Sequence, residues 1–369
     1  MKFRRMPIEK ESPEEFGYGN IACNLSESSV SDQVLGDLEV RLQDLALAYV
    51  EHRGDLRLRE LIAAGHDGIS PEHVLVTPGA AAALFIVHLV LLDKGDHLVV
   101  EHPNYGTNLE TPRAIGCALD TLPLAFESGF QPDLDLLRAT TSSRTRLISV
   151  TNPHNPTGVL KPEAVMHDLL GIAGDRGARL LVDETYRDVS AVEKPPLAAA
   201  LDRRALSVSS MSKAYGLPGI RIGWVVTRDP ALMEDLLAAK EQILICNSAV
   251  DEAIAVQVLA KRDDVLGGIR THVARNYGVL KEWKARQPWL EWVEPQAAVV
   301  AFPRFRGDLR VDVDAFYSVL LREYRTFVGP GHWFEMDDRY MRIGYGYPND
   351  AEMREGLRSV ERAAASAQR

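Results

Sequence analysis

One lysine stands between two residues that suit a phosphate. Lys213 follows Ser210 by three residues and precedes Arg221 by eight. The flanking segments 205–209 and 220–227 are short, apolar and β-prone, so we expect a buried strand on each side. An ammonium is costly in apolar surroundings, so we expect the pKa of Lys213 to fall and its amine to become nucleophilic. A serine hydroxyl and a guanidinium nearby can bind a phosphate.

A lysine beside a phosphate site suggests a Schiff base with pyridoxal phosphate. Taken alone, the stretch 210–222 also fits a surface loop with a solvated lysine and arginine, because short motifs match by chance. The stretch resembles the lysine segment of fold-type I pyridoxal-phosphate enzymes, the class I/II aminotransferase family. Other motifs along the chain decide between these interpretations.

The segment 152–158 joins a β-prone run to a turn with two prolines. Pro153 and Pro156 stiffen the turn and restrict the residues before them to extended conformations. This fixes Asn155, whose amide could donate to the phenolic oxygen of the cofactor, and the resemblance also places it beside the substrate. The alternative, a rigid turn without further function, explains the prolines but not why the strand should end so elaborately.

An apolar run, 179–183, ends in the carboxylate of Asp183. A carboxylate at the end of a buried strand is costly unless paired, and a protonated pyridine nitrogen is a suitable partner. Tyr186 could reach the phenolic oxygen together with Asn155, and we count it with Lys213 and Asp183 among the catalytic candidates. The alternative is a strand-end carboxylate that caps the next helix.

The remaining cofactor candidates depend on the resemblance. A strand at 74–77 runs through Gly79 into a helix, where the backbone N–H groups of Gly79, Ala80 and Ala81 could cradle a phosphate. The family often has a hydroxyl residue after this glycine, so here the phosphate site depends more on Ser210 and Arg221. The resemblance also places Tyr105 against the pyridine ring; a buried tyrosine is the alternative.

Arg342 lies in an apolar β-context, where an unpaired guanidinium is costly. In the family, an arginine here binds the substrate α-carboxylate with two parallel hydrogen bonds. A structural salt bridge is the alternative. The N-terminal arm of such enzymes passes over the active site, so Glu27 could face substrate; we favour a solvated loop acid for it.

Tyr49 and Gly54 begin a pattern that the family shares, with leucine and arginine at 58 and 59. The family's tyrosine belongs to the phosphate site of the neighbouring subunit. The resemblance therefore implies a homodimer with active sites at the interface. Half-buried packing is the alternative for Tyr49.

The resemblance covers about residues 45–350, and strand and helix patterns alternate from 74 to 227. This predicts an α/β fold: a three-layer, mainly parallel sheet of the PLP-transferase type, with a smaller α+β C-terminal domain. We expect an N-terminal arm and part of the small domain at 1–45, a large cofactor domain at 46–262 and a small domain at 263–369.

Composition narrows the partners to small molecules. The net charge of −10 over 369 residues argues against nucleic acid or an anionic membrane. The apolar run 84–92 is too short to cross a bilayer, and no apolar segment follows the basic first residues as in a secretory signal. Cys23, Cys117 and Cys246 show neither a disulfide framework nor zinc spacing. We therefore expect a soluble cytoplasmic protein without a metal.

The expected reaction is transamination of an α-amino acid. The amino acid displaces Lys213, which then acts as the base at Cα, while Asp183 sustains the electron sink. Retention of the carboxylate by Arg342 argues against decarboxylation. The segments 152–158, 212–219, 301–305 and 342–346 are also similar to the capreomycidine synthase family, which cyclises a hydroxylated arginine. Elimination or replacement, including chemistry on S-adenosylmethionine, is a further alternative. A non-catalytic regulator of this fold would carry a DNA-binding module, for which we expect no room.

Overall fold

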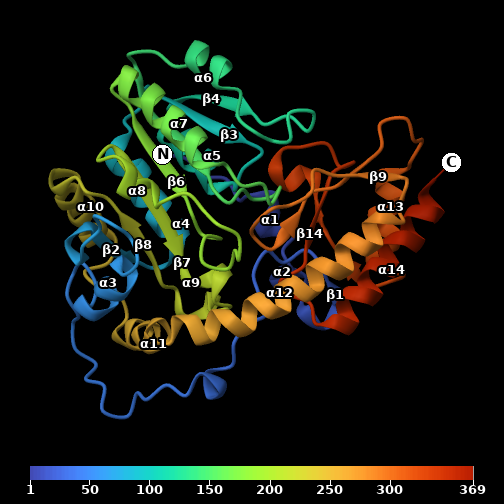
Figure 1. The fold of residues 1–369 in the computed structure, drawn as a ribbon, viewed down its shortest axis with the longest axis horizontal. Coiled ribbons are helices and arrows are strands. Elements are labelled where there is room, and N and C mark those ends of the chain that lie inside the picture. The colour runs from blue at the N-terminus through green and yellow to red at the C-terminus, as the bar shows by residue number, and fades with distance from the viewer. Residues whose placement is uncertain (369) are drawn as a thin grey trace.

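A seven-stranded sheet forms the centre of the molecule, as seen in a computed structural model that describes residues 1–368 (Figure 1). Its strand order is β2-β8-β7-β6-β5-β3-β4. The strands from β4 to β7 run parallel, and β8 is antiparallel to both of its neighbours. The expected mainly parallel sheet is confirmed. The bounds are β2 Val74–Thr77, β3 His97–His102, β4 Ala118–Pro123, β5 Thr145–Thr151, β6 Arg179–Asp183, β7 Ala205–Ser210 and β8 Gly223–Val226.

Helices cover both faces of this sheet, because successive side chains of a strand point to opposite faces. Leu181 packs with α4 (Gly79–Leu91) and α10 (Pro230–Ile243), whereas its neighbours Leu180 and Val182 pack with α7 (Glu163–Arg176) on the other face. Both faces are therefore apolar, as a parallel sheet requires. The shorter helices beside it are α3 Leu56–Ala63, α5 Thr107–Ile115, α6 Leu134–Thr140, α8 Ala198–Leu201 and α9 Met211–Ala214.

A second group of elements follows α11 (Ala249–Ala260) and the long α12 (Arg262–Ala285), which leads away from the large sheet in Figure 1. Its centre is an antiparallel sheet in the order β10-β14-β13. The bounds are β9 Leu290–Glu291, β10 Val300–Ala301, β11 Arg304–Phe305, α13 Val313–Arg322, β12 Thr326–Phe327, β13 Gly329–Pro330, β14 Met341–Gly344 and α14 Asp350–Ala367.

The N-terminal segment belongs spatially to this second group. It contains α1 (Pro7–Lys10), α2 (Pro13–Phe16) and β1 (Cys23–Asn24). The strand β1 pairs in parallel with β12, some three hundred residues later in the chain. This pairing carries the residues that follow β1 toward β14.

One strand is shorter than the sequence predicts, and the backbone gives the reason. Arg221 has a φ of 45°, in the left-handed region that interrupts an extended chain. The predicted strand at 220–227 therefore begins only at Gly223, after a 3₁₀ turn at Pro218–Ile220. Within residues 1–368, every helix is too short or too polar to pass through a bilayer.

Candidate active site

A cavity of about 230 Å³ opens at the carboxyl ends of β5, β6 and β7, next to the start of α4. The N-terminal segment, the large sheet and the C-terminal elements all contribute to its walls. Ten of the predicted site residues line it: Ala80, Ala81, Tyr105, Asn155, Asp183, Tyr186, Ser210, Lys213, Arg221 and Arg342. Residues spread over more than 260 positions of the sequence are thus brought to one place.

Lys213 lies in α9 and donates from Nζ to Oε1 of Glu27 over 3.0 Å. Glu27 was expected to be a solvated loop acid; this was wrong, because it lines the cavity with only 15% of its side chain exposed. Burial alone would raise the pKa of Glu27, but the Lys213 ammonium lowers it to about 2. Burial disfavours the Lys213 ammonium, yet Glu27 raises the pKa of Lys213 above its ordinary value. The predicted fall was therefore wrong, because the sequence did not reveal this carboxylate.

The start of α4 packs against Arg221. Gly79 has a φ of 83°, and a Cβ there would lie 2.5 Å from Nη2 of Arg221, so this close approach requires glycine. The guanidinium donates from Nη1 to Oγ of Ser212 at 3.4 Å and to the carbonyl of Pro218 at 2.8 Å. A helix N-terminus, two serines and an arginine therefore meet at one end of the cavity, which is the donor set that a phosphate prefers.

Asp183 ends β6 inside the cavity. Its Oδ1 accepts from the backbone N–H of Thr185 at 3.0 Å and from the Thr185 hydroxyl at 2.6 Å. It thus organises a turn rather than capping a helix, since the next helix, α8, begins only at Ala198. Burial raises the pKa of Asp183, and the two bonds from Thr185 oppose this rise.

Arg342 is 3% exposed and donates from Nη1 to Oδ1 of Asn155 at 3.2 Å and from Nη2 to the carbonyl of Ser26 at 2.6 Å. Its charge also lies 5.1 Å from the ring centre of Phe334. Among residues 1–368 the buried Nε has no hydrogen-bond partner, and no carboxylate forms an ion pair with the guanidinium. Because Asn155 accepts through Oδ1, its Nδ2 remains a donor.

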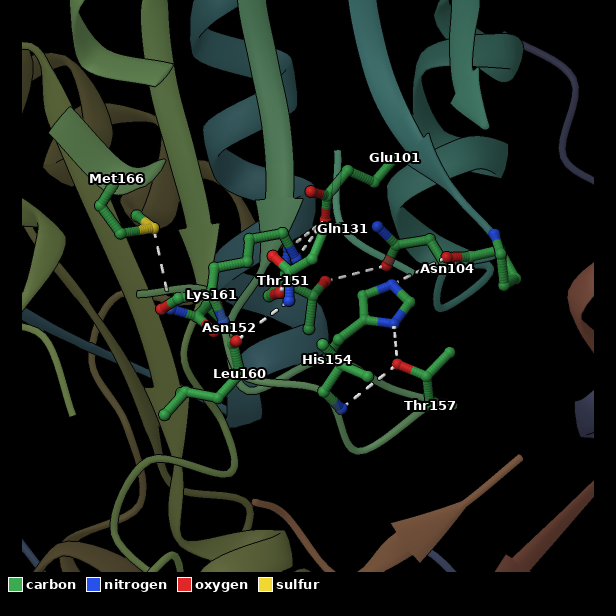
Figure 2. A network of polar contacts seen from close by, with 12 residues as sticks. Glu101, Asn104, Gln131, Thr151, Asn152, His154, Thr157, Leu160, Lys161 and Met166 are labelled. Atoms are coloured by element: carbon green, nitrogen blue, oxygen red, sulfur yellow. Dashed lines mark hydrogen bonds and ion pairs between the residues drawn. The ribbon is translucent and has the colours of Figure 1, made fainter. Parts of the chain in front are cut away.

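A buried polar network holds the turn that carries Asn155 (Figure 2). His154 contacts the Thr157 hydroxyl at 2.8 Å through Nδ1 and the Pro103 carbonyl at 3.0 Å through Nε2. In the same network Lys161 pairs with Glu101 at 3.0 Å, and both side chains are fully buried. The network ties the Asn155 turn to the turn before Tyr105, so it sets the distance between these two walls of the cavity.

Two tyrosines complete the wall. Tyr186 is 3% exposed, and burial raises its pKa, while Lys213 and Arg342 oppose the rise. The hydroxyl of Tyr105 donates to Oε1 of Glu9 at 3.3 Å, so the N-terminal helix α1 closes over this side. Burial likewise raises the pKa of Tyr105.

Tyr49 lies apart from these residues, with 81% of its surface exposed. The sequence analysis also missed part of the lining. The missed residues share no sequence motif, and only Ser212, next to Lys213, gave a local signal. The missed lining residues include Ser26, Ser28, Thr151, Thr185, Ser212, Trp333, Glu9 and Glu14.

The chain belongs to the aminotransferases of class I and II, because the model of that family matches residues 27–360. The cofactor of the chain is therefore pyridoxal 5'-phosphate, and the cavity fits it. The glycine-dependent approach of α4 to Arg221 forms a phosphate-sized donor set at one end, and a lysine and a buried carboxylate lie beyond it.

Comparison with individual proteins gives two kinds of relative. The chain is 33% identical to capreomycidine synthase of Streptomyces vinaceus over 358 residues, which are 93% of this chain and 90% of that protein. A PLP-dependent aminotransferase from Streptococcus suis 89-1591 has a TM-score of 0.92 at 27% identity, covering 100% of both chains. The PLP-dependent cyclase OrfR has a TM-score of 0.88 at 25% identity, covering 99% of this chain and 98% of that one.

Proposed function

We propose that the protein is a PLP-dependent aminotransferase that binds an α-amino acid by its carboxylate and removes the Cα proton with Lys213. The observation that carries this proposal is the presence of Lys213 and Arg342 in one cavity, with Asp183 at its base. Arg342 already binds a neutral carbonyl and an amide oxygen, and its buried Nε is available to a carboxylate.

The other residues have supporting roles in this proposal. Ser210, Ser212, Arg221 and the N–H groups at the start of α4 hold the phosphate, and Asp183 pairs with the pyridine nitrogen. Bound in this way, the cofactor supplies a ring that accepts the electron pair left at Cα. Asn155 and Tyr186 hydrogen-bond its phenolic oxygen, and Tyr105 packs against its face.

Cyclisation of a cationic amino acid is a second candidate. The identity to capreomycidine synthase supports it, and so does the charge of the cavity wall, where Glu9, Glu14 and Glu27 face inward. A guanidinium side chain would find carboxylates there, whereas a dicarboxylic amino acid would be repelled.

The deciding experiment presents amino acids one at a time, including arginine and its hydroxylated derivatives, and identifies the products by mass spectrometry. Release of a keto acid when an amino acceptor is present supports transamination. A ring-closed product that has lost one water supports the cyclase. Recovery of every amino acid unchanged by fully loaded enzyme would contradict both.

Reduction with borohydride tests the lysine assignment. We expect it to fix the cofactor at Lys213 of the wild-type protein, whereas Lys213→Ala should remain folded and unlabelled. Lys240 is the informative competitor, because it is buried and its pKa is lowered by burial to about 8. Labelling at Lys240 would overturn the assignment.

A further inference from the structure

The carboxylate of Glu27 is held rigidly beside the reactive lysine. Its Oε1 accepts from Lys213 Nζ at 3.0 Å and from the backbone N–H of Ser28 at 2.8 Å. The carbonyl of Leu25 accepts from the N–H of Gly344 at 2.7 Å. A Cβ at Gly344 would lie 1.8 Å from the Glu27 carbonyl, so the backbone of Glu27 is seated directly on β14. The position of this carboxylate is therefore fixed by the fold.

The partner of Glu27 must change during any reaction in which Lys213 acts. As a nucleophile or as a base, Lys213 is a neutral amine, and Glu27 then faces no ammonium. A largely buried carboxylate without a cation is costly. The charge of Arg342 still lowers the pKa of Glu27, but its hydrogen bonds go to Asn155 and Ser26. The Glu27 carboxylate is therefore left without a hydrogen-bonded cation, and a second cation can take that place.

The arrangement of charges in the cavity indicates that an amino acid supplies that cation. Arg342 donates to the carbonyl of Ser26, the residue before Glu27. The guanidinium of Arg342 and the carboxylate of Glu27 therefore line the same cavity, with the guanidinium bonded to the backbone next to Glu27. An amino acid carries its own carboxylate and ammonium on a single carbon. The two groups of the protein are thus arranged with charges complementary to those of the ligand.

We propose that Glu27 binds a cationic nitrogen of the amino acid substrate, at the place where the Lys213 ammonium lies in this structure, while Arg342 binds the carboxylate. The role given to Arg342 rests on the proposed function; the role of Glu27 is new. The cation is either the α-ammonium or a charged side chain. Other acids of the wall are engaged differently: Asp183 bonds Thr185, and Glu9 accepts from Tyr105.

The test measures the binding of three probes by calorimetry, to the wild-type holoenzyme and to the Glu27→Gln holoenzyme. None of the probes is turned over by Cα deprotonation, because each lacks either the α-amine or the Cα proton. Pentanoate carries only the carboxylate, α-methylnorvaline adds the α-ammonium, and 5-guanidinopentanoate adds a cationic side chain instead. We expect Glu27→Gln to weaken one of the two cationic probes by about tenfold or more and to leave pentanoate unchanged. Loss for α-methylnorvaline identifies the α-ammonium, and loss for 5-guanidinopentanoate the side chain.

Glu15→Gln is the matched control, because Glu15 is an exposed acid of the same N-terminal segment and pairs with Arg5. It should leave all three affinities unchanged. Equal binding of both cationic probes to wild type and Glu27→Gln would overturn the proposal. Pentanoate reports separately on the proposed function, since its binding should depend on Arg342 and not on Glu27.

A second measurement does not depend on the single variant Glu27→Gln, and compares Lys213→Ala with the double variant instead. Lys213→Ala removes the ammonium and keeps the carboxylate, so this variant should bind ethylguanidinium, which does not condense with the cofactor aldehyde. Lys213→Ala/Glu27→Gln should not bind it. Equal binding by the single and double variants, or no binding by Lys213→Ala, would also overturn the role of Glu27.

Discussion

Arg342 is a buried guanidinium that bonds the protein through two nitrogens, and its Nε is left for a ligand. If it binds the α-carboxylate, Arg342→Lys should raise the KM for the amino acid strongly, because an ammonium cannot reproduce two parallel hydrogen bonds. The loss should be on the order of 2–4 kcal/mol, since a charge is left badly paired in a dry site. Cofactor content should stay normal, and amino acid amides should lose their disadvantage relative to free acids. A lower melting temperature with an unchanged acid-to-amide preference would instead make Arg342 purely structural.

Asp183 can be tested without disturbing its turn. Asparagine keeps an Oδ1 that accepts from Thr185, so Asp183→Asn removes the charge and preserves both hydrogen bonds. Without the carboxylate the pyridine nitrogen is less often protonated, and we expect turnover to fall by about a hundredfold or more. Cofactor affinity, measured by equilibrium dialysis, should fall as well. Near wild-type turnover would restrict Asp183 to organising the turn.

Residues with a local signal were predictable from the sequence, and residues paired across the chain were not. Lys213, Asp183 and Asn155 each follow an apolar strand, and the carboxyl ends of parallel strands meet at one edge of the sheet. Glu27 follows no such strand. Its partner Lys213 lies 186 positions away, so only the packing of the N-terminal segment on β14 brings them together. The direction of the Lys213 pKa was missed for the same reason.

At the scale of elements, the pair of Glu101 at the end of β3 and Lys161 after β5 joins two loops of the site (Figure 2). Lys161→Met should destabilise the fold by about 3–5 kcal/mol, because it leaves a buried carboxylate without its cation. Adding Glu101→Gln should restore much of this loss, since glutamine still accepts from the N–H of Thr151. Denaturant unfolding of the two variants checks this. Equal stability of the single and double variants would show that the pair contributes little.

Helix α4 carries a buried histidine among apolar residues, and this predicts sensitivity to acid. Burial lowers the pKa of His88 to about 4, while contact with the Leu84 carbonyl opposes the shift. The unfolded chain takes up this proton below its ordinary pKa of 6.5, so stability is lost as the pH falls from 6.5 to 4. The loss amounts to roughly 3 kcal/mol. We expect His88→Leu to lose less stability than wild type between pH 7.5 and pH 4.5.

Denaturant unfolding of wild type and His88→Leu across this pH range checks the prediction. If the unfolding free energy of His88→Leu changes with pH in parallel with wild type, His88 takes up its proton as readily in the folded protein as in the unfolded chain, which would contradict the prediction.

At the scale of the whole molecule, a long blue loop leads to α3 at the bottom of Figure 1. Tyr49, seven residues before α3, is 81% exposed and is not among the residues that line the chain's own cavity. Val34, Leu35 and Leu47 are also exposed in this region, and such apolar surface favours an interface. We predict a homodimer in which Tyr49 reaches the partner's phosphate site. Mixing inactive Tyr49→Phe with Lys213→Ala should restore part of the activity. No recovery after proven subunit exchange would contradict a shared site.

The division into an arm (1–45), a large domain (46–262) and a small domain (263–369) stays a proposal. Helix α12 begins at Arg262 and leads away from the large sheet, which supports a boundary near 262. Alternating patterns predicted the large sheet well, because its strands are four to seven residues long and form recognisable apolar runs. They missed several strands of the small sheets, because strands of two residues, such as β1 and β13, carry too little periodicity to recognise.

The seating of Glu27 on Gly344 has a consequence for how the protein is made. The ribosome synthesises residues 23–27 some three hundred residues before β12 and β14, which hold them in the folded protein. The large sheet, complete by residue 226, can form while the nascent N-terminal segment still has no place to dock. Closing so long a loop is slow. Lys213 can therefore take its place in the fold before Glu27 docks beside it, and the cavity is completed last.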